Sequence, residues 1–206
     1  MSPQSASTFP LNAAEVALQG VTAEAVNYRG RAALRVVEAA GPPTDAHALA
    51  VIVGSDFKDG VIETAVAGAP RAGAAEGMRG FVGVAFRVQP GAAAFECFYL
   101  RPTNGRANDQ LRRNHATQYI SHPDYPWYRL REETPGVYES YTDLVPGEWT
   151  PLRIVVARGR AELYVNGAEQ PCLVVNDLKL GEAAWGQIAL WIGAGTEAYF
   201  AEVRVR

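Results

Sequence analysis

The residues best suited to chemistry gather in one polar segment, from Glu96 to Tyr141. This segment contains six arginines, two of the three histidines and many of the tyrosines of the chain. Guanidinium groups bind carboxylates through two parallel hydrogen bonds, and aromatic rings offer flat faces for stacking. We therefore predict that the segment forms a site for a polar ligand, and that the rest of the chain is the framework that positions it.

Alternation along residues 95–101 divides the first candidates between two faces of a predicted strand. Successive side chains of a strand point to opposite sides, so Tyr99 and Arg101 share one face and Glu96 lies on the other. Either Tyr99 and Arg101, or Glu96, are therefore directed at the ligand. Arg101 would bind the ligand there; the alternative is a structural arginine that bridges carbonyl groups at the strand end.

A second alternating stretch, residues 115–120, is interpreted in the same way. His115 and Tyr119 fall on one face, which we expect to point toward the ligand. They are candidate catalytic residues, with Glu96 as the third, and Gln118 is a candidate ligand contact. The alternatives are a structural histidine in a polar network and an ordinary half-buried tyrosine.

Aromatic rings and further arginines follow in the sequence. Prolines restrict the backbone before Trp127, which we predict to be a stacking platform for the ligand. Arg129 and Arg131 alternate with Leu130, so they would share a face and at least one would bind the ligand. Trp191 is predicted to form the floor of the site. The alternatives are a Trp127 that packs its loop onto the framework and a Trp191 that covers the other sheet.

The remaining sequence shows the strand periodicity that could position these residues. Hydrophobic side chains alternate with polar or small ones in residues 82–88, 152–156 and 187–192, and turn signals such as Arg29-Gly30 and Asn166-Gly167 separate such stretches. Roughly a dozen short strands with this spacing are typical of two packed antiparallel sheets. We therefore predict an all-β sandwich formed by a single domain of the whole chain.

Three other stretches complete this prediction. Residues 198–206 are expected to close the chain as its last strand, and residues 13–18 to form at most one helical turn. Residues 102–126 interrupt the rhythm of short strands, and long connections in compact domains are usually functional or disordered. We expect this long connection to form one wall of the ligand site.

The order of motifs resembles the concanavalin A-like lectin and glucanase superfamily. In that superfamily a Trp-x-x-Leu-x-Ile strand precedes a strand ending in Tyr-Val-Asn-Gly, and a Gly-x-Ile-x-Leu strand precedes a last strand with a buried Phe. The matching residues of this chain are Trp149, Leu152, Ile154, Tyr164, Val165, Asn166, Gly167, Gly186, Ile188, Leu190 and Phe200. Laminin-G-like domains and the 3-keto-disaccharide hydrolase domain are the most similar branches. The resemblance implies an antiparallel jelly-roll sandwich whose concave sheet binds a carbohydrate.

The catalytic and metal-binding signatures of that superfamily are missing or altered. No Glu-x-Asp-x-x-Glu triplet of laminarinase-type glucanases occurs, and no cluster of Asp and Asn matches the metal sites of legume-type lectins. We therefore expect neither a metal ion nor another cofactor. The alginate-lyase branch carries a Gln-x-His strand; residues 115–119 contain the same residue types in a different order.

Three functions therefore stay open. The first is a non-catalytic domain that recognises a poly- or oligosaccharide, with acidic sugars favoured by the arginines. The second is a carbohydrate-active enzyme. A glycoside hydrolase needs two carboxylates about 5–9.5 Å apart, and the dense segment offers Glu96, Glu132 and Glu139. The third is a non-catalytic protein-interaction domain of the laminin-G-like type.

A polysaccharide lyase would use other residues of the same segment. Arg101 or Gln118 would neutralise the carboxylate of a uronic acid, and His115 or Tyr119 would move the proton. These residue types suit lyase chemistry, and the sequence does not decide between binding and catalysis.

Composition excludes several other classes of partner. The net charge of −3 and the pI near 5.7 argue against binding to nucleic acid. No apolar stretch approaches the about 20 residues that span a membrane. We see no signal peptide and expect a cytoplasmic protein, or a secreted one if a leader is missing from this sequence. Cys97 and Cys172 are predicted to be free thiols. The sequence does not predict the oligomeric state.

Overall fold

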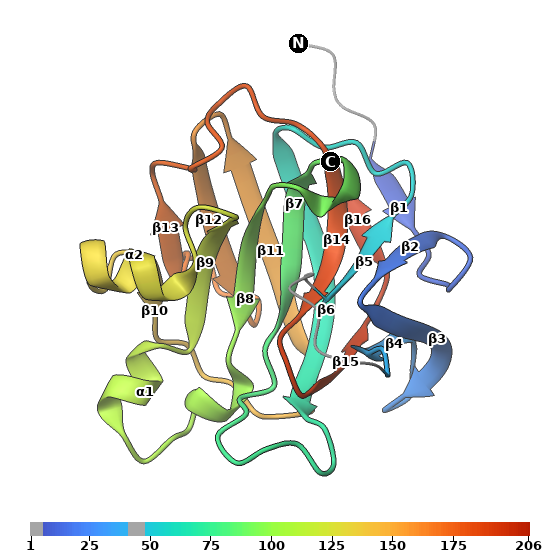
Figure 1. Ribbon diagram of the computed structural model, residues 1–206, viewed down its shortest axis with the longest axis horizontal. Coiled ribbons are helices and arrows are strands. Elements are labelled where there is room, and N and C mark those ends of the chain that lie inside the picture. The colour runs from blue at the N-terminus through green and yellow to red at the C-terminus, as the bar shows by residue number, and fades with distance from the viewer. Residues whose placement is uncertain (1–5, 41–47) are drawn as a thin grey trace.

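Two antiparallel sheets pack against each other in the computed structural model, which describes residues 6–40 and 48–206 (Figure 1). The strands of the nine-stranded sheet are β1 (Ser7–Phe9), β3 (Val21–Tyr28), β4 (Arg31–Glu38), β6 (Gly60–Pro70), β11 (Thr150–Ala157), β12 (Arg160–Val165), β13 (Leu173–Val175), β15 (Thr196–Phe200) and β16 (Val203–Val205). The strands of the seven-stranded sheet are β2 (Val16–Gln19), β5 (Ala48–Ile52), β7 (Val82–Val88), β8 (Phe95–Leu100), β9 (Thr117–His122), β10 (Glu139–Ser140) and β14 (Gln187–Ile192).

The strand order places the predicted site on the seven-stranded sheet. Its order is β10-β9-β8-β7-β14-β5-β2, and the other sheet runs β13-β12-β11-β6-β15-β4-β3, with β16 and β1 attached through β6. Because β8, β9 and β14 carry Glu96, Tyr99, Gln118, Tyr119 and Trp191, this sheet supplies half of the predicted site residues, and α2 (Trp127–Glu133) supplies Trp127, Arg129 and Arg131. The all-β, two-sheet antiparallel fold is confirmed.

Tight turns explain why the hairpins form where the sequence predicts them. Arg29 and Gly30 between β3 and β4 both have positive φ angles, 49° and 76°, as a two-residue hairpin turn of type I′ requires. Asn166 and Gly167, which follow β12, also have positive φ angles, 57° and 72°. Gly30 and Gly167, which adopt positive φ angles at little steric cost, therefore fix where these strands end.

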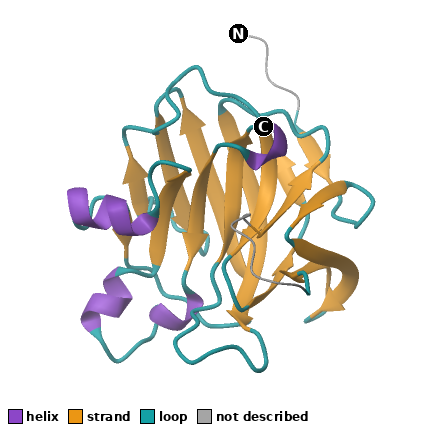
Figure 2. Cartoon of the chain, viewed as in Figure 1, coloured by secondary structure: helices purple, strands orange, loops and turns teal. Residues whose placement is uncertain are grey.

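The sequence missed two short helices and misjudged both chain ends. Helices α1 (Gln110–Asn114) and α2 (Trp127–Glu133) lie at the same side of the sandwich, next to β9 and β10 (Figures 1 and 2). Single turns of 3₁₀-helix, η1 (Pro90–Ala92) and η2 (Pro102–Asn104), complete the structure. The predicted last strand is divided into β15 and β16, and β2 occupies part of the predicted helical turn.

The core lies between the two sheets, and one contact identifies the inner face of the seven-stranded sheet. A Cβ atom on Gly68 of β6 would overlap with the side chain of Val82 of β7, so Val82 points toward the nine-stranded sheet. Val82 pairs with Leu100, and Phe98 lies two residues along the same strand on the same face. Tyr99, between them, must therefore point outward.

Both cysteines are free: Cys97 is buried and Cys172 half-buried. Within the described residues, no helix is long and apolar enough to cross a membrane.

Candidate functional site

A row of directly opposed residues crosses the outer face of the seven-stranded sheet. Trp191 of β14 pairs with Gly83 of β7, which pairs with Tyr99 of β8; Tyr99 pairs with Gln118 of β9, which pairs with Glu139 of β10. Opposed residues of neighbouring strands point to the same face. The register alone therefore brings residues from 83 to 191 into one line, which we call the outer row.

Gly83 allows the two large rings of the outer row to meet. The ring centroids of Tyr99 and Trp191 lie 4.7 Å apart, although their strands are separated by β7. A Cβ atom at position 83 would overlap with the carbonyl oxygen of Phe98 and with Cβ of Tyr99. Phe81 stacks on Tyr99 at 5.3 Å. The missing side chain at position 83 thus creates a shallow aromatic floor.

Arg101 lies above this row and organises it. Its Nη2 donates hydrogen bonds to the hydroxyl oxygen of Tyr99 at 3.0 Å and to Oε1 of Gln118 at 2.9 Å, and its Nη1 donates to the carbonyl oxygen of His115 at 3.0 Å. Arg101 is only 4% exposed. Its guanidinium group is therefore engaged with the protein itself, and it holds the neighbouring side chains in position for other groups to bind.

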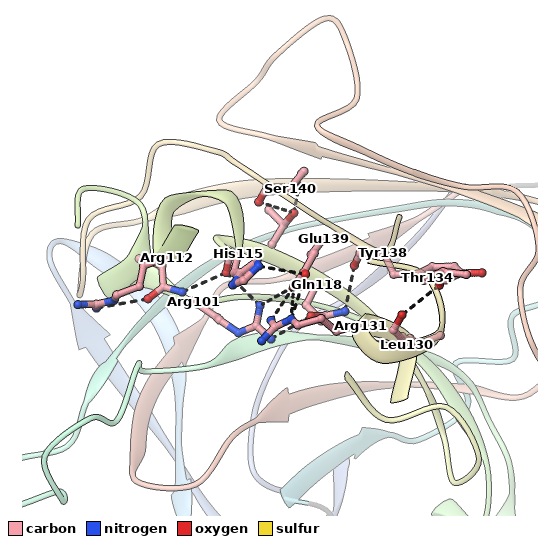
Figure 3. Close-up of polar contacts among 12 residues, drawn as sticks. Arg101, Arg112, His115, Gln118, Leu130, Arg131, Thr134, Tyr138, Glu139 and Ser140 are labelled. Carbon is pink, nitrogen blue, oxygen red and sulfur yellow. Dashed lines mark hydrogen bonds and ion pairs between the residues drawn. The ribbon is translucent and has the colours of Figure 1, made fainter. Parts of the chain in front are cut away.

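Glu139 ends the row, and three cationic or titratable side chains surround its carboxylate (Figure 3). Arg131 donates from Nη2 to Oε2 at 2.6 Å and from Nε to Oε1 at 3.0 Å. Nε2 of His115 lies 3.1 Å from Oε1, and Nη1 of Arg101 lies 3.9 Å from Oε2. The carboxylate is 4% exposed, so buried ion pairing fixes α2 and the end of α1 against β10.

A hollow of about 770 Å³ opens beside this carboxylate. Charged, polar and apolar residues all line this hollow. The lining residues are Leu111, Asn114, His115, Arg131, Pro135, Gly136, Glu139, Ser140 and Tyr141. Ligand sites in proteins typically combine apolar walls with a few placed polar groups in about 300–1,000 Å³. We call this cavity the Arg131 hollow. Leu111, Asn114 and His115 come from the long connection, which therefore forms one wall of this hollow.

The outer row and the Arg131 hollow are joined by Trp127. Its ring lies under the guanidinium carbons of Arg131, at 4.7 Å, and of Arg101, at 6.0 Å. Trp127 is the first residue of α2 and remains 41% exposed. An exposed ring held by two arginines is restricted in its rotamers and still accessible, which suits a stacking platform.

The electrostatics of the hollow leave a positive excess. Burial lowers the pKa of His115 below its ordinary value of 6.5; Glu139 opposes this shift, and Arg131 and Arg101 add to it. His115 is therefore neutral at pH 7, and two guanidinium groups face one carboxylate. Nη1 of Arg131 makes no hydrogen bond within the part of the chain that the structure describes. Burial also raises the pKa of Tyr99 to about 12, so its hydroxyl group stays protonated.

Two predicted catalytic residues lie elsewhere. Glu96 and Tyr119 point inward, the hydroxyl of Tyr119 donates to the Glu96 carboxylate, and Oε1 of Glu96 accepts from the backbone of Leu180 at 2.8 Å. Both side chains are fully buried. The expectation that Tyr119 points toward the ligand together with His115 is therefore wrong. Tyr119 pairs with Phe98 and so lies on the inner face of the sheet, whereas Gln118 lies on the outer face.

The prediction that Arg129 and Arg131 share one face, as they would on a strand, is also wrong, because both residues lie on helix α2. Residues two apart on a helix point in different directions, so Arg129 pairs with Glu133 at 2.7 Å and covers Tyr125, while Arg131 reaches Glu139. The structure brings together Tyr99, Arg101, His115, Gln118, Trp127, Arg131 and Trp191. Within the wall predicted from the long connection, the sequence did not single out Leu111 and Asn114, for which the helix N-cap at Asp109 was the available signal.

No metal centre is evident: within the described residues, no group of three or more His, Cys, Asp and Glu side chains could hold an ion.

Comparisons with known proteins identify the fold. No family model matches the chain, and no curated protein matches it in sequence. Among solved structures, the carbohydrate-binding module CBM66 from Bacillus subtilis matches with a TM-score of 0.56 and 12% identity, covering 92% of this chain and 97% of that one. A protein of unknown function with a galectin-like fold from Bacillus subtilis gives 0.59 and 12%, covering 94% and 90%.

A third solved structure, a native glycosidic hydrolase, has a TM-score of 0.51 and 13% identity and covers 98% of this chain and 94% of that one. At such identities the likeness concerns the fold alone. The protein therefore has a two-sheet jelly-roll sandwich fold similar to that of these three structures, which is the fold that the sequence motifs predict.

Proposed function

We propose that the protein is a carbohydrate-binding domain that takes an acidic poly- or oligosaccharide in the Arg131 hollow, beside Trp127. The observation that carries the proposal is the junction of Trp127 with Arg131. An aromatic ring for the apolar face of a sugar lies within 4.7 Å of a guanidinium group whose Nη1 is available to a carboxylate. These two groups are the ones that an acidic sugar ring requires.

The fold supports the same class of ligand. A carbohydrate-binding module and a glycosidic hydrolase share it at TM-scores above 0.5. The positive excess of Arg101 and Arg131 over Glu139 favours an anionic ligand over a neutral one, although the whole chain carries a net charge of −3. Local charge thus opposes the global charge at this hollow.

A lyase is the second candidate, because one contact favours it. His115 is within hydrogen-bonding distance of Glu139, and a carboxylate in this position orients an imidazole for proton transfer. A hydrolase with two carboxylates is less well supported. Glu96 is sealed in the interior and Glu132 is exposed on α2, which leaves Glu139 as the carboxylate that lines the hollow.

Two measurements on the same sample test the proposal. Isothermal calorimetry should detect binding of an oligogalacturonate or oligoalginate tetramer and weaker binding of a neutral tetrasaccharide such as cellotetraose. Absorbance at 235 nm, which reports the unsaturated product of β-elimination, should stay constant for a binding domain and rise for a lyase. Equal or tighter binding of the neutral sugar, or no binding of any uronate oligomer, would refute an acidic-sugar site.

A further inference from the structure

A second hollow, which shares no lining residue with the Arg131 hollow, has the composition of a sugar site. Its volume is about 350 Å³, and it lies between the segment before β11 and the end of β12. Its polar and aromatic lining comes mainly from Arg106, Asp143, Glu148, Trp149 and Asn166. None of these residues contributes to the Arg131 hollow.

Trp149 is fixed in place before any ligand arrives. Its Nε1 donates to the carbonyl oxygen of Tyr28 at 3.2 Å, and its ring meets Tyr28 edge-on at 5.7 Å. The guanidinium carbon of Arg31, which lines a different hollow, lies over the same ring at 5.4 Å from its centroid. Tyr28 is itself held by a parallel stack on Tyr199 at 3.6 Å and by a hydrogen bond to Gly147 at 2.8 Å. A ring that is already immobilised loses little conformational entropy on binding.

The polar groups around this ring offer both donors and acceptors. Arg106 and Asp143 form a bidentate pair with both distances at 2.7 Å, and Nδ2 of Asn166 donates to the carbonyl oxygen of Asp143 at 2.9 Å. The pair is more than half exposed on both sides, where ion pairs add little to stability. Its outer oxygen lone pairs and guanidinium protons are thus accessible to ligand hydroxyl groups.

The charges of the second hollow are balanced, in contrast to those of the first. Arg106 pairs with Asp143, and Glu148 pairs with Arg29 at 2.5 Å. An anion would gain nothing from two neutral pairs, whereas the hydroxyl groups of an uncharged sugar can both accept and donate hydrogen bonds there.

We propose that this Trp149 hollow is a second carbohydrate subsite, and that it binds a neutral sugar unit through stacking on Trp149 and hydrogen bonds to the Arg106–Asp143 pair. The subsite does not depend on the acidic site at Arg131. One segment joins the two, because Glu139 to Tyr141 line the first hollow and Asp143 to Thr150 line the second. Leu144, which lines the second hollow, packs so tightly on Gly105 that a Cβ atom on Gly105 would overlap with the Leu144 backbone.

The test is an amide NMR titration with neutral tetrasaccharides, namely cellotetraose, maltotetraose and mannotetraose, each added to the wild-type chain. We expect at least one of them to shift the amides of Leu144–Thr150 and the indole N–H of Trp149. Asp143→Ala should weaken that titration at least about tenfold, since it removes the acceptor and releases Arg106. Glu202→Gln, which breaks a similarly exposed ion pair with Arg204 far along the chain, should leave it unchanged.

The same titration distinguishes the two proposals. Arg131→Ala should abolish uronate binding and leave the neutral-sugar shifts at Trp149 intact. The second subsite is refuted if none of the three sugars shifts these resonances, or if their shifts persist unchanged in both Asp143→Ala and Arg106→Ala. Both substitutions are at exposed side chains, so the variants should fold as the wild type does.

Discussion

The carboxylate of Glu139 accepts hydrogen bonds from both Nε and Nη2 of Arg131, and this single ion pair ties helix α2 to the edge strand β10. Both residues of the pair also line the hollow. Because Arg131 keeps its Nη1 directed away from Glu139, one side chain both builds the site and offers a donor to a ligand.

Trp127→Ala should weaken binding of a uronate oligomer about tenfold or more, because the stacking face beside Arg131 is lost. Tyr128→Ala is the matched control: it removes a neighbouring ring that is 61% exposed and keeps the Trp127 ring beside Arg131. Calorimetry on both variants measures the difference. Similar losses for the two would show that Trp127 has no special part in binding.

The pKa of His115 should report occupancy of the hollow. The pKa of His115 in the folded chain lies below its ordinary value of 6.5, so the unfolded chain binds the proton more readily. The free energy of unfolding therefore falls as the pH drops from 6.5 through the folded-state pKa. A bound anion favours the imidazolium form and should raise that pKa. NMR titration of the His115 ring with and without a uronate oligomer measures the change, and His122, outside the hollow, serves as the internal control. If the pKa of His115 is the same with and without the uronate oligomer, anion binding in the hollow is contradicted.

Gly83→Ala should lower the free energy of unfolding by about 3 kcal/mol, because the new methyl group overlaps with β8 and has nowhere to move. Gly159→Ala should cost less than about 1 kcal/mol, since its nearest neighbour is the flexible side chain of Glu182 at 3.3 Å. Urea unfolding of both variants tests the prediction. If the two substitutions cost the same, the aromatic floor does not require glycine at position 83.

Glu96 should make the fold sensitive to rising pH. Burial raises its pKa above the ordinary 4.5, so the folded chain retains this proton to higher pH than the unfolded chain. Its contribution to stability is full below 4.5 and is lost as the pH rises through the raised pKa. Glu96→Gln should remove that decline in urea unfolding measured from pH 4 to 8. An unchanged pH profile would mean that Glu96 ionises normally.

The framework could be predicted because its signals are local. Period-two alternation places Val82, Phe98 and Leu190 on inner faces, and positive-φ turns such as Asn166-Gly167 end the strands. The pairing of strands distant in the chain is not local, so the outer row that joins Trp191 to Tyr99 through Gly83 could not be read from the sequence. It depends on register across strands.

The site could be predicted only in part for a related reason. Helices of five and seven residues are too short to show a 3.6-residue period. Arg129 and Arg131 were therefore treated as strand neighbours with a shared face. Similarly, the outward position of Gln118, and the inward one of Tyr119, follow from where β9 begins, at Thr117 and not at His115.

The most direct test of the account compares two arginines on the same helix. Arg131→Ala removes the proposed donor to the ligand. Arg129→Ala, two residues before it on α2, removes an exposed side chain that pairs with Glu133. Arg131→Lys, which keeps the charge and loses the bidentate geometry, shows whether any effect comes from misfolding, and near-ultraviolet circular dichroism checks the packing of all three. Calorimetry with a uronate tetramer should show a loss of affinity of at least about tenfold for Arg131→Ala, an intermediate loss for Arg131→Lys and wild-type affinity for Arg129→Ala. Equal affinities for Arg131→Ala and Arg129→Ala, in folded proteins, would contradict an acidic-sugar site at this hollow.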